Sequence, residues 1–108
     1  MKYLAFLILS ITITTQNIDK LHNDAKQAFY TNDYATAITK WQTALDLAQQ
    51  VDNKANISKF LVNLGAVNYS ISKYQVALEY FQQAVLIDQE LNDKNGQGSD
   101  HHYLGLIY

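Results

Sequence analysis

The chain has 108 residues, enough for one domain, of which 48% are hydrophobic and 17% charged, and its net charge is −2. Cysteine and proline are both absent, which excludes a disulfide framework and a thiolate metal site and favours helices. All eight basic residues are lysines, and they are scattered along the chain. Without the arginine forks that grip phosphates and guanine edges, the sequence predicts no nucleic-acid partner.

The N-terminus carries a short hydrophobic segment. Lys2 precedes an apolar run over residues 3–13, which is too short for a membrane span of about 20 residues. The run fits the apolar core of a secretory signal peptide over residues 1–15, although threonines stand where a cleavage site prefers alanine. An uncleaved anchor and a buried segment of the domain remain alternatives. We therefore expect an exported protein (periplasmic, secreted or at the cell surface) if the signal is real, and a membrane-anchored or cytoplasmic one otherwise. Membrane contact is expected only through this segment, if it is not cleaved.

The rest of the chain has the spacing of amphipathic helices separated by short polar turns. The clearest stripe, with steps of three and four residues, consists of Tyr74, Ala77, Leu78, Phe81, Ala84 and Val85. Turn residues such as Asn32-Asp33 and Ser72-Lys73 separate it and its neighbours. The predicted helices are 18–31, 34–50, 54–71, 74–91 and a last one from about 98 to 108.

The same stripe occurs 40 residues earlier, as Tyr34, Ala37, Ile38, Trp41, Ala44 and Leu45. This offset divides the chain into a first unit at 18–57, a second at 58–97 and the start of a third at 98–108. Each unit is a pair of helices. Because one helix pair cannot bury its apolar face alone, neighbouring units are expected to stack.

The residues at fixed offsets resemble those of the tetratricopeptide repeat family. In the second unit they are Leu61, Leu64-Gly65, Tyr69, Tyr74, Ala77, Phe81 and Ala84. The resemblance implies an all-α fold of antiparallel helix pairs stacked as a right-handed solenoid. The unit is longer than the common 34 residues, and Gln49 and Gln89 stand where a proline is usual. The structural repeat positions are Ala25, Ala37, Trp41, Ala44, Gly65, Ala77, Phe81, Ala84 and Gly105.

No catalytic or metal-binding constellation stands out. His101 and His102 are adjacent, so they point about 100° apart on a helix, and His22 is expected to be an exposed helix residue. Asp88 and Glu90 are expected to be solvated carboxylates on a helix surface. The serines have no positioned base, and no phosphate-binding glycine loop occurs. The sequence therefore predicts a protein that is not an enzyme and has no cofactor or metal.

The resemblance also implies an inner surface lined by the first helix of each unit. Lysines, asparagines and tyrosines there suit an extended peptide, since asparagine amides can pair with its backbone. The candidate groove residues are His22, Asn23, Lys26, Tyr30, Lys59, Asn63, Tyr69 and His102. Asn63 matches one position of the clamp with which some family members bind a C-terminal carboxylate, but the complete clamp is absent. Ordinary solvated helix faces are the alternative interpretation.

The leading hypothesis is a non-enzymatic scaffold that binds a protein or peptide. The amino-acid sequence around residues 37–45 is similar to that of exported bacterial repeat proteins, especially cyanobacterial ones. In those proteins, such arrays often precede a caspase-like or CHAT domain. The chain could thus instead be a structural spacer or oligomerisation segment of a larger protein. Residues 103–108 are an apolar stretch in mid-helix, so we expect a longer array or self-association through this last helix.

Overall fold

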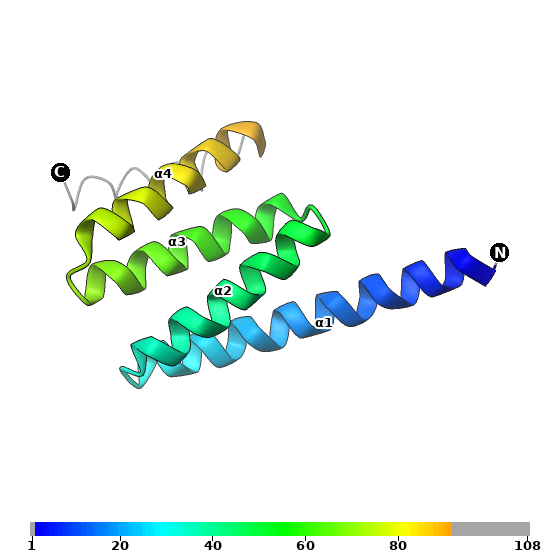
Figure 1. Cartoon of the computed structure of the whole chain (residues 1–108), viewed down its shortest axis with the longest axis horizontal. Helices are drawn as coiled ribbons and strands as arrows, with labels where there is room; N and C mark the ends of the chain where they lie inside the picture. The colour runs from blue at the N-terminus through cyan, green and yellow to red at the C-terminus, as the bar shows by residue number, and fades with distance from the viewer. Residues whose placement is uncertain (1, 92–108) are drawn as a thin grey trace.

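The computed structural model describes the backbone of residues 2–91 and the side chains of residues 13–91. Every regular element in this part is a helix, and consecutive helices pack against each other in chain order (Figure 1). The helices are α1 (Lys2–Tyr30), α2 (Tyr34–Gln50), α3 (Lys54–Ser70) and α4 (Tyr74–Leu91). The prediction of an all-α fold built from helix pairs is confirmed, with α1 and α2 as the first pair and α3 and α4 as the second.

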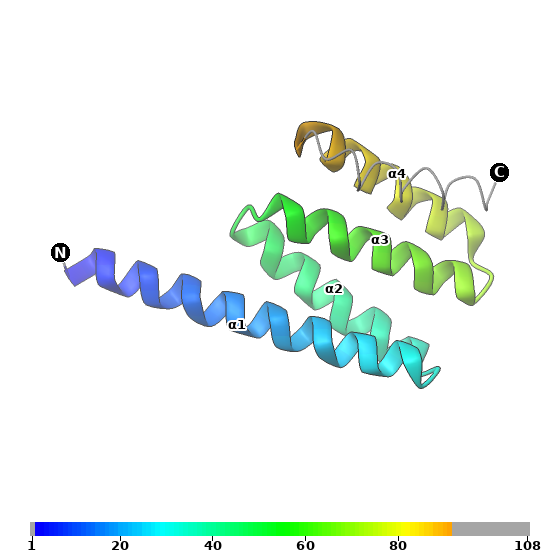
Figure 2. The same cartoon turned by 180° about the vertical axis from the view of Figure 1, so that it is seen from behind.

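The first helix is longer than the sequence pattern indicated. It begins at Lys2 rather than near Ile18, and its N-terminal part extends beyond the other helices (Figures 1 and 2). The apolar segment is thus continuous with α1. Within the described part of the chain, no helix combines the length and the apolar character needed to cross a membrane. The division into units and the signal segment stay predictions.

Small residues sit at the closest helix contacts. Ala25, Ala37, Ala44, Ala77 and Ala84 are all completely buried. The aromatic repeat residues Trp41 and Phe81 are buried beside them, as expected for side chains that fill the space between alanines. A Cβ added to Gly65 would lie only 2.3 Å from the Phe81 ring, so glycine allows the close approach of α3 and α4. Gly105 lies outside the described residues.

The three turns between helices repeat one backbone pattern. Asn32, Asp52 and Ser72 each adopt positive φ, the left-handed conformation that ends many helices. The residue after each of them donates its backbone N–H to a carbonyl five positions back, as in Asp33 N to Ala28 O at 2.8 Å. This is the hydrogen-bond pattern of a Schellman motif, here made without glycine. The three turns therefore share one local backbone geometry.

A buried polar contact, which the sequence did not predict, lies between α3 and α4. Asp88 is buried, with 2% exposure, and Ser58 donates its hydroxyl to Asp88 Oδ1. The expectation of a solvated Asp88 was wrong, because its helix position is the counterpart of the buried Ala48, forty residues earlier. Glu90 is exposed, as expected, and pairs with Lys54 at 2.9 Å.

Candidate functional site

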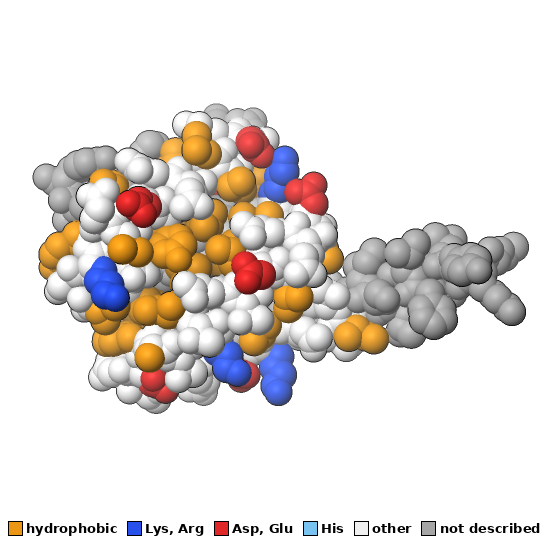
Figure 3. Space-filling model, in the orientation of Figure 1, with side chains coloured by type: hydrophobic (Ala, Val, Ile, Leu, Met, Phe, Trp, Pro, Cys, Tyr) orange, Lys and Arg blue, Asp and Glu red, His pale blue; other side chains and the backbone are white. Residues whose placement is uncertain are grey.

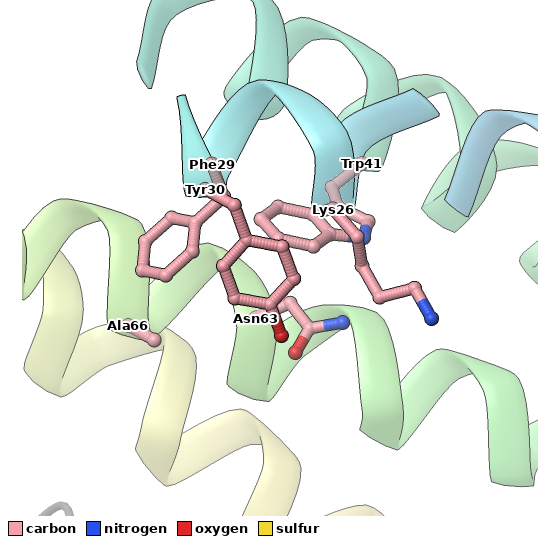
Figure 4. Close-up of a pocket in the computed structure, with 6 residues that line it drawn as sticks. All are labelled: Lys26, Phe29, Tyr30, Trp41, Asn63 and Ala66. Atoms are coloured by element: carbon pink, nitrogen blue, oxygen red, sulfur yellow. The ribbon is translucent and has the colours of Figure 1, made fainter. Parts of the chain in front are cut away.

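Two cavities lie along α1, and the first of them is also bounded by α2 and α3. The first, of about 230 Å³, is lined by Lys26, Phe29, Tyr30, Trp41, Asn63 and Ala66 (Figure 4). The second, of about 320 Å³, is lined by Asn23, Lys26, Gln27 and Tyr30. Lys26 and Tyr30 line both cavities, which are therefore neighbours, and we call the two cavities together the α1–α3 groove.

Helical spacing places the lining residues together. Asn23, Lys26, Gln27 and Tyr30 are three or four residues apart on α1, so they share one face. Asn63 and Ala66 are three apart on α3 and form the opposite wall. The third contribution comes from α2, whose Trp41 closes the space between the two walls. In Figure 4 the Tyr30 ring, the Lys26 stem and the Asn63 amide surround the opening.

Trp41 is held in place by His22. The indole Nε1–H donates to His22 Nδ1 at 3.0 Å, and the His22 ring also lies 5.5 Å from the Phe60 ring, centroid to centroid. Burial, assisted by the charges of Lys59 and Lys26 and opposed by Asp19, lowers the pKa of His22 from 6.5 to about 4. The imidazole is therefore neutral near pH 7, as it must be for Nδ1 to accept the hydrogen bond.

His22 is thus a positioning residue rather than an exposed one, and the expectation from the sequence was wrong. The reason lies on another helix. Only the Trp41 side chain, 19 residues further on, supplies the donor that makes a partly buried imidazole favourable here.

The side-chain amides and the lysine of the groove have no polar partner among the described residues. Among the described residues, no hydrogen bond engages the side-chain amide of Asn23 or Asn63, and no carboxylate forms an ion pair with Lys26. The Tyr30 side chain is 75% exposed at the rim. Amides that can both donate and accept, beside a cation and aromatic rings, can bind a polypeptide backbone together with a side chain.

Apart from His22, which holds Trp41, the predicted site residues divide into two groups. The structure brings together Asn23, Lys26, Tyr30 and Asn63 in the groove. The others lie elsewhere: Lys59 is over the Phe60 ring at 5.6 Å, Tyr69 packs against Tyr74 with ring centroids 5.2 Å apart, and His102 falls outside the described residues. Trp41 was assigned a structural role alone, yet it also lines the groove. Only the side-by-side placement of α1, α2 and α3 shows this second role.

Metal chemistry finds no support in this part of the molecule. Among the described residues, no group of three or more histidines, aspartates or glutamates lies close enough to hold an ion.

The helix pairs repeat every 40 residues, contain buried alanines and border a groove beside their first helices. These features define a helical repeat protein, of the class that binds other proteins. The sequence model of the tetratricopeptide repeat matches residues 19–108. The chain therefore belongs to the tetratricopeptide repeat family.

One curated relative supports this assignment. The chain is 29% identical over 104 residues to a human protein described as cell division cycle protein 16 homolog. The match covers 93% of this chain but only 17% of the relative. The family generally serves as a protein-interaction repeat rather than as an enzyme, so the structure is that of a protein–protein interaction module.

Proposed function

We propose that the α1–α3 groove binds an extended segment of a partner protein. The observation that carries this proposal is a pair of side-chain amides that form no hydrogen bond among the described residues. Asn63 lines the first cavity and Asn23 the second, beside Lys26 and aromatic rings. An extended peptide presents backbone N–H and C=O groups at regular intervals, and amide side chains match both. The chain would act as a scaffold without chemistry of its own.

Pull-down experiments test this role. The parent chain and the Asn63→Ala and Lys26→Ala variants would be used as bait in an extract of the source cells. A groove binder should lose its specific partner in both variants. Gln42→Ala, on the exposed side of α2, is the matched control and should retain it. Retention of the partner by both groove variants would contradict the proposal.

One observation favours a spacer or self-association role instead. Leu86 is 61% exposed on α4, whereas its counterpart in the first unit is the charged Asp46. An exposed leucine at that position suits packing against a further unit or a second chain. If so, Leu86→Asp should reduce self-association in analytical ultracentrifugation and leave partner binding unchanged.

We also propose that the N-terminal segment directs export. The support is the lysine followed by an apolar run of signal-peptide length. A fusion of residues 1–30 to alkaline phosphatase should be active outside the cytoplasm. A fusion with two aspartates placed in the apolar run should be inactive, and equal activity of both would contradict export.

A further inference from the structure

We infer that the segment bound in the α1–α3 groove carries a large apolar side chain adjacent to an acidic side chain. This inference rests on the proposed function and specifies its ligand. It combines the lining of the first cavity with the charge at its border.

The first cavity is shaped for one apolar side chain. Phe29, Tyr30 and Trp41 line it with three aromatic rings, and on α3 the small side chain of Ala66 leaves space for a ligand (Figure 4). Its volume of about 230 Å³ is far more than a single water requires. Aromatic rings are common surroundings of an anchoring apolar side chain. The polar groups of the lining are the Asn63 amide, the Lys26 ammonium and the Tyr30 hydroxyl.

The positive charge of Lys26, at the edge of the first cavity, favours a ligand with an acidic residue next to its apolar anchor. Lys26 lines both cavities, and Lys59, which lines neither, adds to the positive potential that Lys26 exerts at His22. The ion pair that the structure describes, Lys54 with Glu90, lies away from the groove and does not neutralise either lysine. Three aromatic rings alone could attract a cation, but the Lys26 ammonium repels one. A carboxylate beside the apolar anchor would instead form a charge-assisted hydrogen bond with Lys26.

The carboxylate belongs to a side chain rather than to a chain terminus. The second cavity adjoins the first at Lys26 and Tyr30 and is also lined by Asn23 and Gln27. A segment that occupies both cavities would pass Lys26, with backbone on either side of it. This favours an internal stretch of the partner.

Selection from a display library of random linear peptides, flanked by fixed glycine-serine sequences, tests the inference. The parent chain should enrich peptides that have a large apolar residue within one or two positions of Asp or Glu. Lys26→Glu should remove the acidic preference and keep the apolar one. Lys73→Glu is the matched control, because this exposed lysine precedes α4 and lines neither cavity, and it should enrich the same peptides as the parent.

The affinity of one enriched peptide can be followed with the chain's single tryptophan, since Trp41 lines the cavity. Lys26→Glu should weaken binding by at least about tenfold, as expected for loss of a charge-assisted contact. Ala66→Leu should weaken it comparably by filling the cavity, and circular dichroism checks that this variant is folded. An amidated form of the peptide should bind as well as the form with a free C-terminus.

The outcomes separate the two proposals. Enriched peptides that depend on Asn63 but are basic, or lack a large apolar residue, would overturn the ligand chemistry and leave groove binding intact. A preference that disappears on amidation would overturn the choice of an internal side chain. Peptides whose binding is unaffected by Asn63→Ala, Lys26→Glu and Ala66→Leu would overturn both the ligand chemistry and the proposed function.

Discussion

The first helix pair has Ala25 where the second has Gly65, and the two pairs use their aromatic residue differently. In the second pair the Phe81 ring lies against the Gly65 backbone, where even a methyl group would collide with it. In the first pair a Cβ is present, and the Trp41 ring is hydrogen-bonded to His22 and reaches the groove. The counterpart of His22 is Val62, which cannot accept a hydrogen bond. The same backbone plan thus places its aromatic residue against a glycine in one pair and beside the α1–α3 groove in the other.

A second contrast concerns the ends of these helices. Ile18 and Ala48 are both buried in the first pair, and their counterparts Ser58 and Asp88 are buried in the second. Asp88 Oδ2 lacks a hydrogen-bond partner in the described structure. Polar groups without full partners reduce stability. The second pair therefore contains a buried polar contact where the first pair has only apolar side chains.

The largest effect is expected for Phe81→Ala. The side chain is completely buried and fills the space over Gly65, so its removal leaves a cavity. We expect a loss of about 3–5 kcal/mol in the free energy of unfolding, measured by urea denaturation. A melting curve equal to that of the parent would contradict the packing described for the second pair.

Gly65→Ala should be the next most harmful change. The added methyl group would force the buried Phe81 ring to move, with an expected loss of about 1–3 kcal/mol. Ala25→Gly is the matched change in the first pair, and it should lose only about 1 kcal/mol through helix propensity. If Gly65→Ala were neutral or stabilising in thermal denaturation, the two pairs would not differ as described.

Ser58→Ala should destabilise the chain by about 1–3 kcal/mol, because it removes the hydroxyl that donates to the buried Asp88. The double variant Ser58→Ile with Asp88→Ala copies the first pair. It should be as stable as the parent or more so, since no buried polar group is then left without a partner. A double variant less stable than Ser58→Ala would show that the polar contact is needed for packing.

Acid should weaken the first pair through His22. In the unfolded chain the imidazole takes up a proton near its ordinary pKa of 6.5, whereas in the folded chain the pKa is about 4. The stability contributed by neutral His22 is therefore complete above about pH 6.5 and is lost as the pH falls toward about 4. The effect is moderate because the imidazole is only partly buried.

The measurement is urea denaturation of the parent and of His22→Gln between pH 4 and 7.5. The difference in stability between the two should shrink as the pH falls, while the carboxylates common to both cancel. A difference that stays constant over this range would show that His22 does not titrate with folding.

The smallest effect concerns the start of α4. Asp33 caps α2 by accepting from Thr36 N at 3.3 Å, but its counterpart Lys73 offers no acceptor and places a positive charge at a helix N-terminus. Lys73→Asp should raise the free energy of unfolding by about 1 kcal/mol. Asp33→Lys should lower it by a similar amount, and the opposite signs can be checked in one set of thermal melts.

The fold was predictable from the sequence because the repeat spacing and the buried alanines are local patterns. Three of the four described helices both begin and end within one residue of the predicted positions, since turn residues such as Asn32 and Ser72 mark their bounds. The start of α1 was missed because the apolar segment continues the helix without a turn. The groove was predictable only in part. Asn63 and Lys26 follow from helix faces, whereas the roles of Trp41 and His22 arise from contact between helices.

Chemical-shift mapping by two-dimensional NMR tests the central claim most directly. An enriched peptide would be titrated into the isotope-labelled chain, and the shifted resonances assigned. The α1–α3 groove as binding surface predicts the largest changes at the Trp41 indole N–H, the Asn23 and Asn63 side-chain amides and the backbone around Lys26 and Tyr30. Changes confined to the exposed faces of α2 and α4, with the Trp41 indole unaffected, would contradict it.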